Sequence, residues 1–237
     1  MNGLAPHLDA AGDGGRSRSI PLPPQRAQLH YISRAVLRPL FRLYFRMRQE
    51  GIEHLPQRGP YLLAPNHVSM LDWAFIHYHL PRPTRFVVHR EYYDHPLMGF
   101  GLRVNGAVAV RTDRPDLTAI RNARAVLAAG EPLILFPEGV ISRSGQPQRG
   151  QPGIISLAAA MRVAIVPVAI RGAFEAFPRW ARVPRPRPVT VVFGEAWPPP
   201  PLCDRRRQQQ LVGQLMRYIG ALLEGAVLPR PEWDAAA

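Results

Sequence analysis

The residues from Tyr61 to Trp73 read YLLAPNHVSMLDW, and a strand pattern passes directly into a helix pattern within them. The first four residues are typical of a short buried strand, whereas Ser69 followed three residues later by Asp72 indicates a helix start. With Ser69 as the N-cap, Asp72 would lie in the first turn and could lean back towards His67. A carboxylate placed there fixes one imidazole tautomer and leaves the other ring nitrogen free to accept a proton, so the stretch predicts a general base.

The same two residues also have a purely structural interpretation. The chain contains 8 histidines, so an aspartate five positions after one of them is unremarkable. Asp72 would then only cap a helix, and His67 would be an ordinary loop histidine. The stretch alone leaves both interpretations open.

Strand and helix patterns alternate along the rest of the chain. This alternation predicts an α/β fold, a single domain with a mixed, largely parallel sheet flanked by helices, preceded by an amphipathic N-terminal helical segment. Functional sites in such sheets lie beyond the carboxyl ends of the strands. The predicted strands are 61–64, 84–89, 107–111, 133–136, 163–170 and 189–193, and the helices predicted among and after them include 115–129, 154–161 and 205–224.

A second stretch with chemical character, Phe136 to Gly139, reads FPEG and follows a predicted buried strand. Pro137 ends the strand and Gly139 permits a tight backbone. We therefore expect Glu138 at the carboxyl end of its strand, on the edge of the sheet where the first stretch also lies.

The chain is strongly basic, with a formal net charge of +13 and a pI near 11.2, and every basic residue other than histidine is arginine. Such a chain favours anionic partners, namely nucleic acid, an anionic membrane surface, or phosphorylated and CoA-like ligands. Arg111 ends one predicted strand and Arg143 follows another, where a guanidinium group could clamp a phosphate. Each arginine taken alone is equally consistent with a solvated loop charge.

Other features of the sequence bear on its compartment. Cys203 is the only cysteine, so no disulfide can form within the chain. No run of about eighteen uncharged apolar residues occurs, and residues 1–19 lack the apolar core of a signal peptide. We therefore expect neither a membrane-spanning helix nor a secretory leader.

The segment 27–50 is amphipathic, with Arg34, Arg38, Arg42 and Arg46 at every fourth position and apolar residues on its other side. This pattern is typical of a helix that lies in a membrane interface, and it also fits a helix that packs on a core and exposes a basic face. We predict a disordered lead at 1–26, the amphipathic membrane-interface helical segment at 27–50, the α/β domain at 51–197, a proline-rich spacer at 198–203, a C-terminal helix packed on the domain at 204–228 and a tail at 229–237.

Four sequence blocks, in order, resemble those of the lysophospholipid/glycerolphosphate acyltransferases. The resemblance extends from Gly51, where the lead-in GIEHLP begins, to about Gly172. The blocks are Asn66-His67-x-Ser69-x-x-Asp72, GAVAVR at 106–111, FPEG at 136–139 and VPVAI at 166–170.

The resemblance implies transfer of an acyl group from an acyl-CoA or acyl carrier protein thioester to the hydroxyl of a lysophospholipid. The expected acceptor is 1-acyl-sn-glycerol-3-phosphate and the expected product is phosphatidic acid. By the same resemblance His67 is the general base and Asp72 orients it, and no metal or cofactor is implied. The substrate-binding residues that it implies are Arg111 for the acceptor phosphate, Glu138 and Gly139 for the acceptor, Pro167 for the acyl pocket, and Arg143, Asn66 and Ser69 nearby.

The partners expected from this resemblance and from the charge are the acyl donor, a lysophospholipid acceptor and an anionic membrane surface. We expect a peripheral or monotopic protein on the cytoplasmic face of the membrane. Nucleic acid is not expected, because no aromatic-interleaved basic stretch of recognisable type occurs. A serine hydrolase is disfavoured, because no Gly-x-Ser-x-Gly motif is present.

The chain departs from the family at several positions, among them about His89, where the family has a lysine, and the third block. After Gly139 the family usually continues Thr-Arg-Ser, whereas this chain has Val140, Ile141 and Ser142, with Arg143 one step later. Another lysophospholipid or a lyso-aminolipid therefore remains open as the acceptor, and a non-catalytic, basic membrane-binding homologue remains an alternative.

Overall fold

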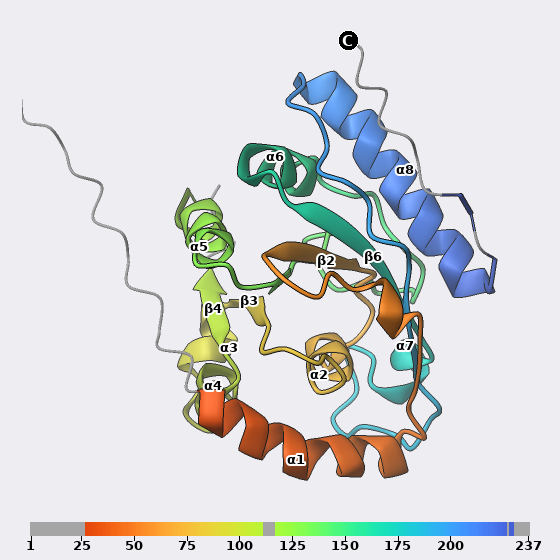
Figure 1. Cartoon of the computed structure of the whole chain (residues 1–237). Coiled ribbons are helices and arrows are strands. Elements are labelled where there is room, and N and C mark those ends of the chain that lie inside the picture. Colours follow the sequence, from red (N-terminus) through yellow and green to blue (C-terminus); the bar gives the residue numbers. More distant parts are fainter. Residues whose placement is uncertain (1–26, 111–116, 227, 230–237) are drawn as a thin grey trace, which may run out of the picture.

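Strand β2 (Tyr61–Pro65), the apolar run that precedes His67, lies in the middle of a seven-stranded sheet (Figure 1). The structure is a computed structural model, which describes residues 27–110, 117–226 and 228–229. Every residue of β2 is buried. Leu62 and Ala64 belong to the core on one face of the sheet, whereas Tyr61 and Leu63 belong to the core on the other, as the period of two along a strand requires.

The strands around β2 are mostly parallel. The order in the sheet is β1-β7-β6-β2-β5-β3-β4, and the pair β6–β7 is antiparallel while the other pairs are parallel. The predicted mixed, largely parallel sheet is confirmed. The remaining strands are β1 (Arg48–Glu50), β3 (Arg85–His89), β4 (Ala107–Val110), β5 (Leu133–Ile134), β6 (Ala164–Arg171) and β7 (Thr190–Phe193).

Helices cover both faces of the sheet (Figure 1). One face carries α5 (Leu117–Ala128), α6 (Gly153–Met161) and α8 (Arg205–Glu224), and the other carries α2 (Asp72–His77) with α1 (Ala27–Tyr44) outside it. The shorter elements are η1 (Ile52–His54), α3 (Arg90–Asp94), α4 (Pro96–Val104) and α7 (Ala173–Ala176).

Two predictions made from the sequence differ from the structure, and one pair of helices was missed. The segment 27–50 is not helical throughout, because the helix ends at Tyr44 and residues 48–50 pair with β7 as an edge strand. Ser69 is not the N-cap, because α2 begins at Asp72 and has Leu71 at that position. The helices between 90 and 104 were not predicted.

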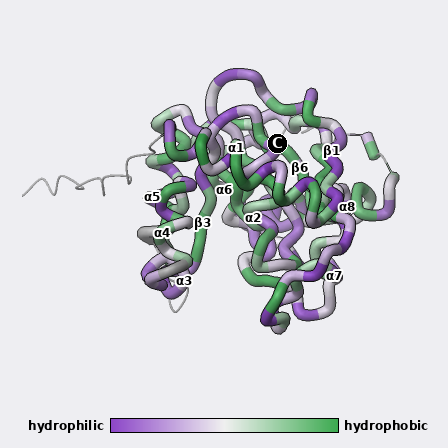
Figure 2. Tube along the Cα trace, turned by 90° about the horizontal axis from the view of Figure 1, so that it is seen from below, coloured by the Kyte–Doolittle hydropathy of each residue, from purple (hydrophilic) through white to green (hydrophobic). Residues whose placement is uncertain are grey.

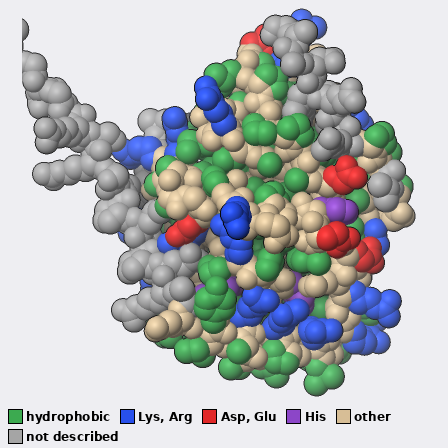
Figure 3. Space-filling view, viewed as in Figure 1, with side chains coloured by type: hydrophobic (Ala, Val, Ile, Leu, Met, Phe, Trp, Pro, Cys, Tyr) green, Lys and Arg blue, Asp and Glu red, His purple; other side chains and the backbone are tan. Residues whose placement is uncertain are grey.

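Helix α1 exposes most of its apolar residues. Its half-buried residues, Ser33, Arg34 and Arg38, lie on the side nearer the protein. The rings of Phe41 and Phe45 each make an edge-to-face contact with Phe75 of α2, and they make a tilted contact with each other. Figure 3 shows hydrophobic side chains along the lower edge of the molecule with arginines just above them, and Figure 2 shows both kinds of residue along α1 from below. The exposed apolar residues of α1 are Tyr31, Ile32, Val36, Leu40, Leu43 and Tyr44.

Candidate active site

The loop from β2 to α2 carries His67 and holds it against Asp72. The Nδ1 atom of His67 lies 2.9 Å from Oδ2 of Asp72. The same oxygen accepts hydrogen bonds from the backbone N–H groups of Val68 at 2.7 Å and Ser69 at 2.8 Å, so the loop folds around one carboxylate oxygen. Because a carboxylate only accepts, Nδ1 of a neutral His67 carries the proton and Nε2 is the nitrogen that can take one.

The environment of this pair is asymmetric. The Asp72 side chain is fully buried, whereas the His67 side chain is 18% exposed. Burial raises the pKa of the Asp72 carboxyl, and the hydrogen bonds donated by His67 and by the two backbone N–H groups oppose that shift. The carboxylate is therefore kept away from solvent while the ring that it orients remains accessible.

Glu138 fixes the backbone of the same loop from the next strand. It lies just beyond β5, and its Oε1 accepts from the His67 backbone N–H at 2.9 Å while Oε2 accepts from that of Gln148 at 3.0 Å. The Ser142 N–H donates to the His67 carbonyl oxygen at 2.7 Å. Burial raises the pKa of the Glu138 carboxyl, and the hydrogen bonds from the backbone N–H groups of His67 and Gln148 oppose the shift. The structure therefore brings Glu138 to His67, and it does so through the main chain.

Phe136 forms one wall of the site. Its ring stacks on that of His67 with centroids 3.8 Å apart and planes inclined by 18°. Neither this contact nor the role of Gln148 was predicted, since nothing in the local sequence pattern links either residue to position 67. The apolar face limits where the imidazole can turn, so the ring is held by Phe136 as well as by Asp72.

Asn66 and Ser69 use their polar atoms within the protein. The Asn66 Oδ1 atom accepts from the N–H of Ile170 at 2.8 Å, and its Nδ2 donates to the Ile170 carbonyl oxygen at 3.4 Å. The Ser69 hydroxyl donates to the carbonyl oxygen of Phe177 at 2.7 Å and accepts from the N–H of Leu71. Both side chains thus join the loop that carries His67 to β6 and to the end of α7, and their role in substrate binding stays a prediction.

The other predicted site residues are more dispersed. Gly139 adopts φ 76°, a conformation that favours glycine, directly after Glu138. Pro167 is buried in β6 beside Ala64 of β2, and Arg143 is exposed. Arg111 lies outside the described residues. In the part of the chain that the structure describes, no group of three His, Cys, Asp or Glu side chains is arranged to hold a metal ion.

His89, at the end of β3, belongs to the surroundings of the site. Burial lowers the pKa of its imidazole, and the charges of His67 and Arg179 act in the same direction. The sequence offers a weak signal here, since a basic residue is usual in the family at about this position.

Comparison with known proteins agrees with this geometry. The sequence model of the family described as Acyltransferase matches residues 46–171. A 1-acyl-sn-glycerol-3-phosphate acyltransferase of Chlamydomonas reinhardtii is 32% identical over 191 residues, which cover 77% of this chain and 57% of that protein. One from Cocos nucifera is 32% identical over 149 residues, which cover 61% of this chain and 47% of the relative. The chain thus spans about half the length of the curated relatives that it matches.

The fold also has a counterpart among solved structures. The crystal structure of the 1-acyl-sn-glycerophosphate acyltransferase from Thermotoga maritima superposes with a TM-score of 0.64 and covers 81% of this chain and 82% of that one. The two sequences are 21% identical, so this likeness concerns the fold.

Proposed function

The chain belongs to the acyltransferase family, as the four sequence blocks predicted, and from this premise we propose that it transfers an acyl group from a thioester to the hydroxyl of a lysophospholipid. The observation that carries the proposal is the hydrogen bond between His67 Nδ1 and Asp72 Oδ2, in a loop whose backbone Glu138 also holds. An alcohol is a poor nucleophile until a base takes its proton, and this arrangement supplies such a base.

The reaction that fits these residues is a direct transfer. His67 Nε2 removes the proton of the acceptor hydroxyl while the oxygen of that hydroxyl attacks the thioester carbonyl carbon. The carbon–oxygen bond forms, the carbon–sulfur bond breaks, and the proton passes from Nε2 to the departing thiolate. Asp72 stabilises the imidazolium that exists between these two steps, so no covalent enzyme intermediate is required.

We propose 1-acyl-sn-glycerol-3-phosphate as the acceptor and phosphatidic acid as the product. The sequence relatives named for that acceptor support this choice, and Arg111 and Arg143 are the arginines that we assign to its phosphate. The donor is acyl-CoA or an acyl carrier protein. Another lysophospholipid or a lyso-aminolipid is the second candidate, because Val140 and Ile141 replace two polar residues of the family pattern.

Purified wild type and His67→Ala, assayed side by side with labelled acyl-CoA and acyl carrier protein donors, test the proposal. We expect a diacyl product from wild type and a rate about 10²–10⁴ lower in the variant, the usual contribution of a general base. A panel of lysophospholipids identifies the acceptor. Transfer by neither protein to any acceptor would instead support the non-catalytic, membrane-binding homologue.

We also propose that α1 lies on an anionic membrane surface, at the cytoplasmic face. Its exposed apolar residues include Leu40 at 55% and Leu43 at 82%, and the arginines of the same helix are close to them in sequence. None of the helices in the described ranges is both long enough and apolar enough to cross a bilayer. In a vesicle sedimentation assay, Leu43→Ser should weaken binding to anionic vesicles, whereas Leu202→Ser, an exposed leucine outside α1, should not.

A further inference from the structure

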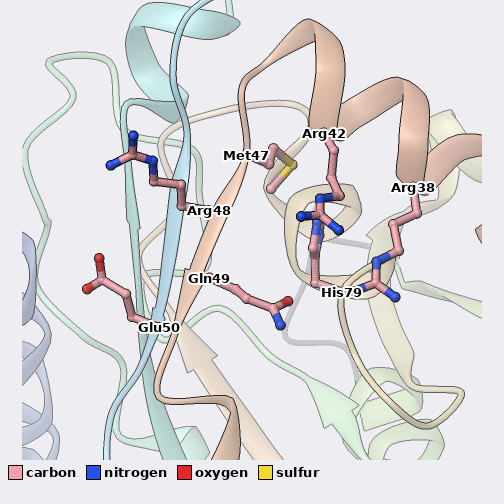
Figure 4. Close-up of a pocket in the computed structure, with 7 residues that line it drawn as sticks. All are labelled: Arg38, Arg42, Met47, Arg48, Gln49, Glu50 and His79. Carbon is pink, nitrogen blue, oxygen red and sulfur yellow. The ribbon is translucent and has the colours of Figure 1, made fainter.

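A basic cavity separates α1 from the edge strand β1 and from the chain that follows α2. Its volume is about 330 Å³, and Arg38, Arg42, Arg48 and His79 are among the residues that line it. Figure 4 shows the side chains of Arg38 and Arg42 reaching down from α1 towards His79. We call it the arginine cavity.

The arginines of the arginine cavity form no ion pair with the described residues. None of the ion pairs between described residues includes Arg38, Arg42 or Arg48. One carboxylate, that of Glu50, also lines the cavity, but it lies 3.6 Å from the guanidinium of Arg171. The guanidinium groups of Arg38 and Arg42, which both reach towards His79 from α1 in Figure 4, repel each other, and an anion bound between them would remove that repulsion.

Two buried polar atoms of these residues also lack hydrogen-bond partners. One is Nε of Arg38, which is a donor, and the other is Nε2 of His79. The His79 residue is only 4% exposed. Buried polar groups in folded proteins are nearly always hydrogen-bonded, so two unpartnered atoms on one cavity indicate a polar ligand.

His79 determines what kind of anion fits. Its Nδ1 lies 3.0 Å from the carbonyl oxygen of Phe75, which can only accept, so Nδ1 carries the proton and Nε2 is an acceptor in the neutral ring. Burial lowers the pKa of His79 to about 4, and the charges of Arg38, Arg42 and Arg34 act in the same direction. The ring is therefore neutral near pH 7, and a ligand that meets it must bring a hydrogen-bond donor of its own.

We propose that the arginine cavity binds hydrogen phosphate or the singly protonated form of a phosphate monoester, with Arg38 and Arg42 on the anionic oxygens and the P–OH group donating to His79 Nε2. Sulfate carries the same charge as hydrogen phosphate but has no proton to donate at neutral pH. A phosphodiester likewise lacks the P–OH group and carries less charge.

This cavity is distinct from the site around His67. Arg48 pairs with Thr190, which pairs with Arg171 near the carboxyl end of β6, so the cavity lies towards the same end of the sheet as His67. Strand β1 is nevertheless three strand spacings from β2, which at about 4.8 Å each is roughly 14 Å. None of the residues that line the cavity is among those whose hydrogen bonds hold the His67 loop.

The phosphate group has two sources, a membrane lipid or a soluble molecule. A lipid headgroup is favoured by the exposed apolar residues of α1, which lie on the same helix as Arg38 and Arg42. The site itself does not depend on the proposed acyl transfer, and its test reads out binding alone.

Isothermal titration of the full chain with inorganic phosphate and with sulfate, at about pH 7, tests the site. We expect tighter binding of phosphate, and a loss of about tenfold or more in Arg42→Ala, because a charge-assisted hydrogen bond is removed from an exposed residue. Arg58→Ala is the control, since it removes one exposed arginine outside the cavity and should leave the affinity unchanged. Equal affinities for phosphate and sulfate, or equal effects of the two substitutions, would overturn the proposal.

A second variant and a lipid arm complete the experiment. In His79→Leu the acceptor is removed, so we expect the preference for phosphate over sulfate to disappear, with thermal melting as the check on folding. Retained preference in a folded His79→Leu protein would contradict the role given to His79. If the source is a lipid, Arg42→Ala should weaken binding of the protein to vesicles that contain phosphatidic acid more than binding to vesicles that contain phosphatidylglycerol. If Arg42→Ala weakens only the binding of inorganic phosphate, the ligand is a soluble molecule.

Discussion

The site around His67 lies at the start of α2 and the arginine cavity lies beyond its end. The charged side chains of the first have partners within the protein, whereas the arginines of the second have no ion-pair partner among the described residues. At the first, the Oδ2 atom of Asp72 receives three hydrogen bonds from the chain, and both oxygens of Glu138 receive one each. At the second, Arg38, Arg42 and Arg48 form no ion pair with any described residue.

This difference teaches what each region can do. Groups that find their partners inside the chain are held in place before a substrate arrives, which is what proton transfer requires. Groups without partners gain them from a ligand, so their contribution appears as affinity. The proposed chemistry and the proposed second site therefore call for different measurements, rates for the first and binding for the second.

The largest effect that would test the comparison is expected from Asp72→Asn. The amide oxygen can take the place of Oδ2 and still accept from Val68, Ser69 and His67, but the negative charge that stabilises an imidazolium is lost. We expect the acyl-transfer rate to fall by about 10²–10⁴, with a loss of stability of about 1–3 kcal/mol because the amide NH₂ would replace Oδ1, which is buried without a partner.

Steady-state rates and urea unfolding measure these two quantities. Asp94→Asn, which changes an exposed aspartate of α3, is the matched control and should leave the rate unchanged. If Asp72→Asn kept the wild-type rate, Asp72 would be a structural residue and the partnered charges would not mark catalysis.

A smaller effect is expected from Glu138→Gln. Both carboxylate oxygens accept from backbone N–H groups, and the amide nitrogen of glutamine cannot replace either of them. The loop that carries His67 should therefore shift, which we expect to lower kcat about 10- to 100-fold and stability by about 1–3 kcal/mol.

The Michaelis constants separate positioning from binding in this variant. A fall in kcat with little change in KM indicates that Glu138 acts through the His67 loop, as its hydrogen bonds suggest. A rise confined to the acceptor KM would instead return Glu138 to the acceptor-binding role implied by the family resemblance. Glu175→Gln, at an exposed position of α7, is the control.

Local patterns in the sequence predicted most of the central strands and the residues at the centre of the site. The apolar run of β2 and the spacing of His67 and Asp72 are contained within thirteen residues, and Glu138 directly follows a recognisable strand. The hydrogen bond from the His67 backbone to Glu138 spans 71 positions, so only the packing of β2 against β5 could reveal it.

Other parts of the structure leave no periodic signal. Strand β1 consists of three exposed polar residues, Arg48 to Glu50, and it forms because its backbone pairs with the edge of β7. The arginine cavity joins α1 to His79 across some forty positions, so tertiary packing alone assembles it. The start of α2 also depends on contacts that the pattern did not reveal. The hydrogen bonds to the Asp72 carboxylate let the helix begin at Asp72, three residues after the predicted N-cap, Ser69.

The smallest effect concerns histidines on the α1 side of the molecule, where the contrast with His67 is sharpest. His77 is fully buried, and its Nε2 lies 2.9 Å from Nδ1 of His30 in α1. Burial lowers the pKa of His77 to about 3, with the charge of His30 acting in the same direction. The unfolded chain, with a pKa near 6.5, therefore binds more protons than the folded one between about pH 6.5 and 3, and stability falls as the pH falls through that window.

The change should approach about 1.4 kcal/mol per pH unit for His77 once the pH is well below 6.5. Asp72 and Glu138, whose pKa values are raised, change stability in the opposite direction on acidification, so the wild-type slope alone is ambiguous. The difference between wild type and His77→Phe, measured by urea unfolding at about pH 7 and about pH 5, isolates the pair of His77 and His30, whose pKa burial also lowers. We expect the variant to lose less stability than wild type on acidification, because phenylalanine can occupy the aromatic surroundings of Trp73 and Phe86 without titrating. Parallel losses in the two proteins would mean that the histidine contact between α1 and α2 tolerates a proton, and that the folded state, like the site around His67, accommodates a charged imidazole.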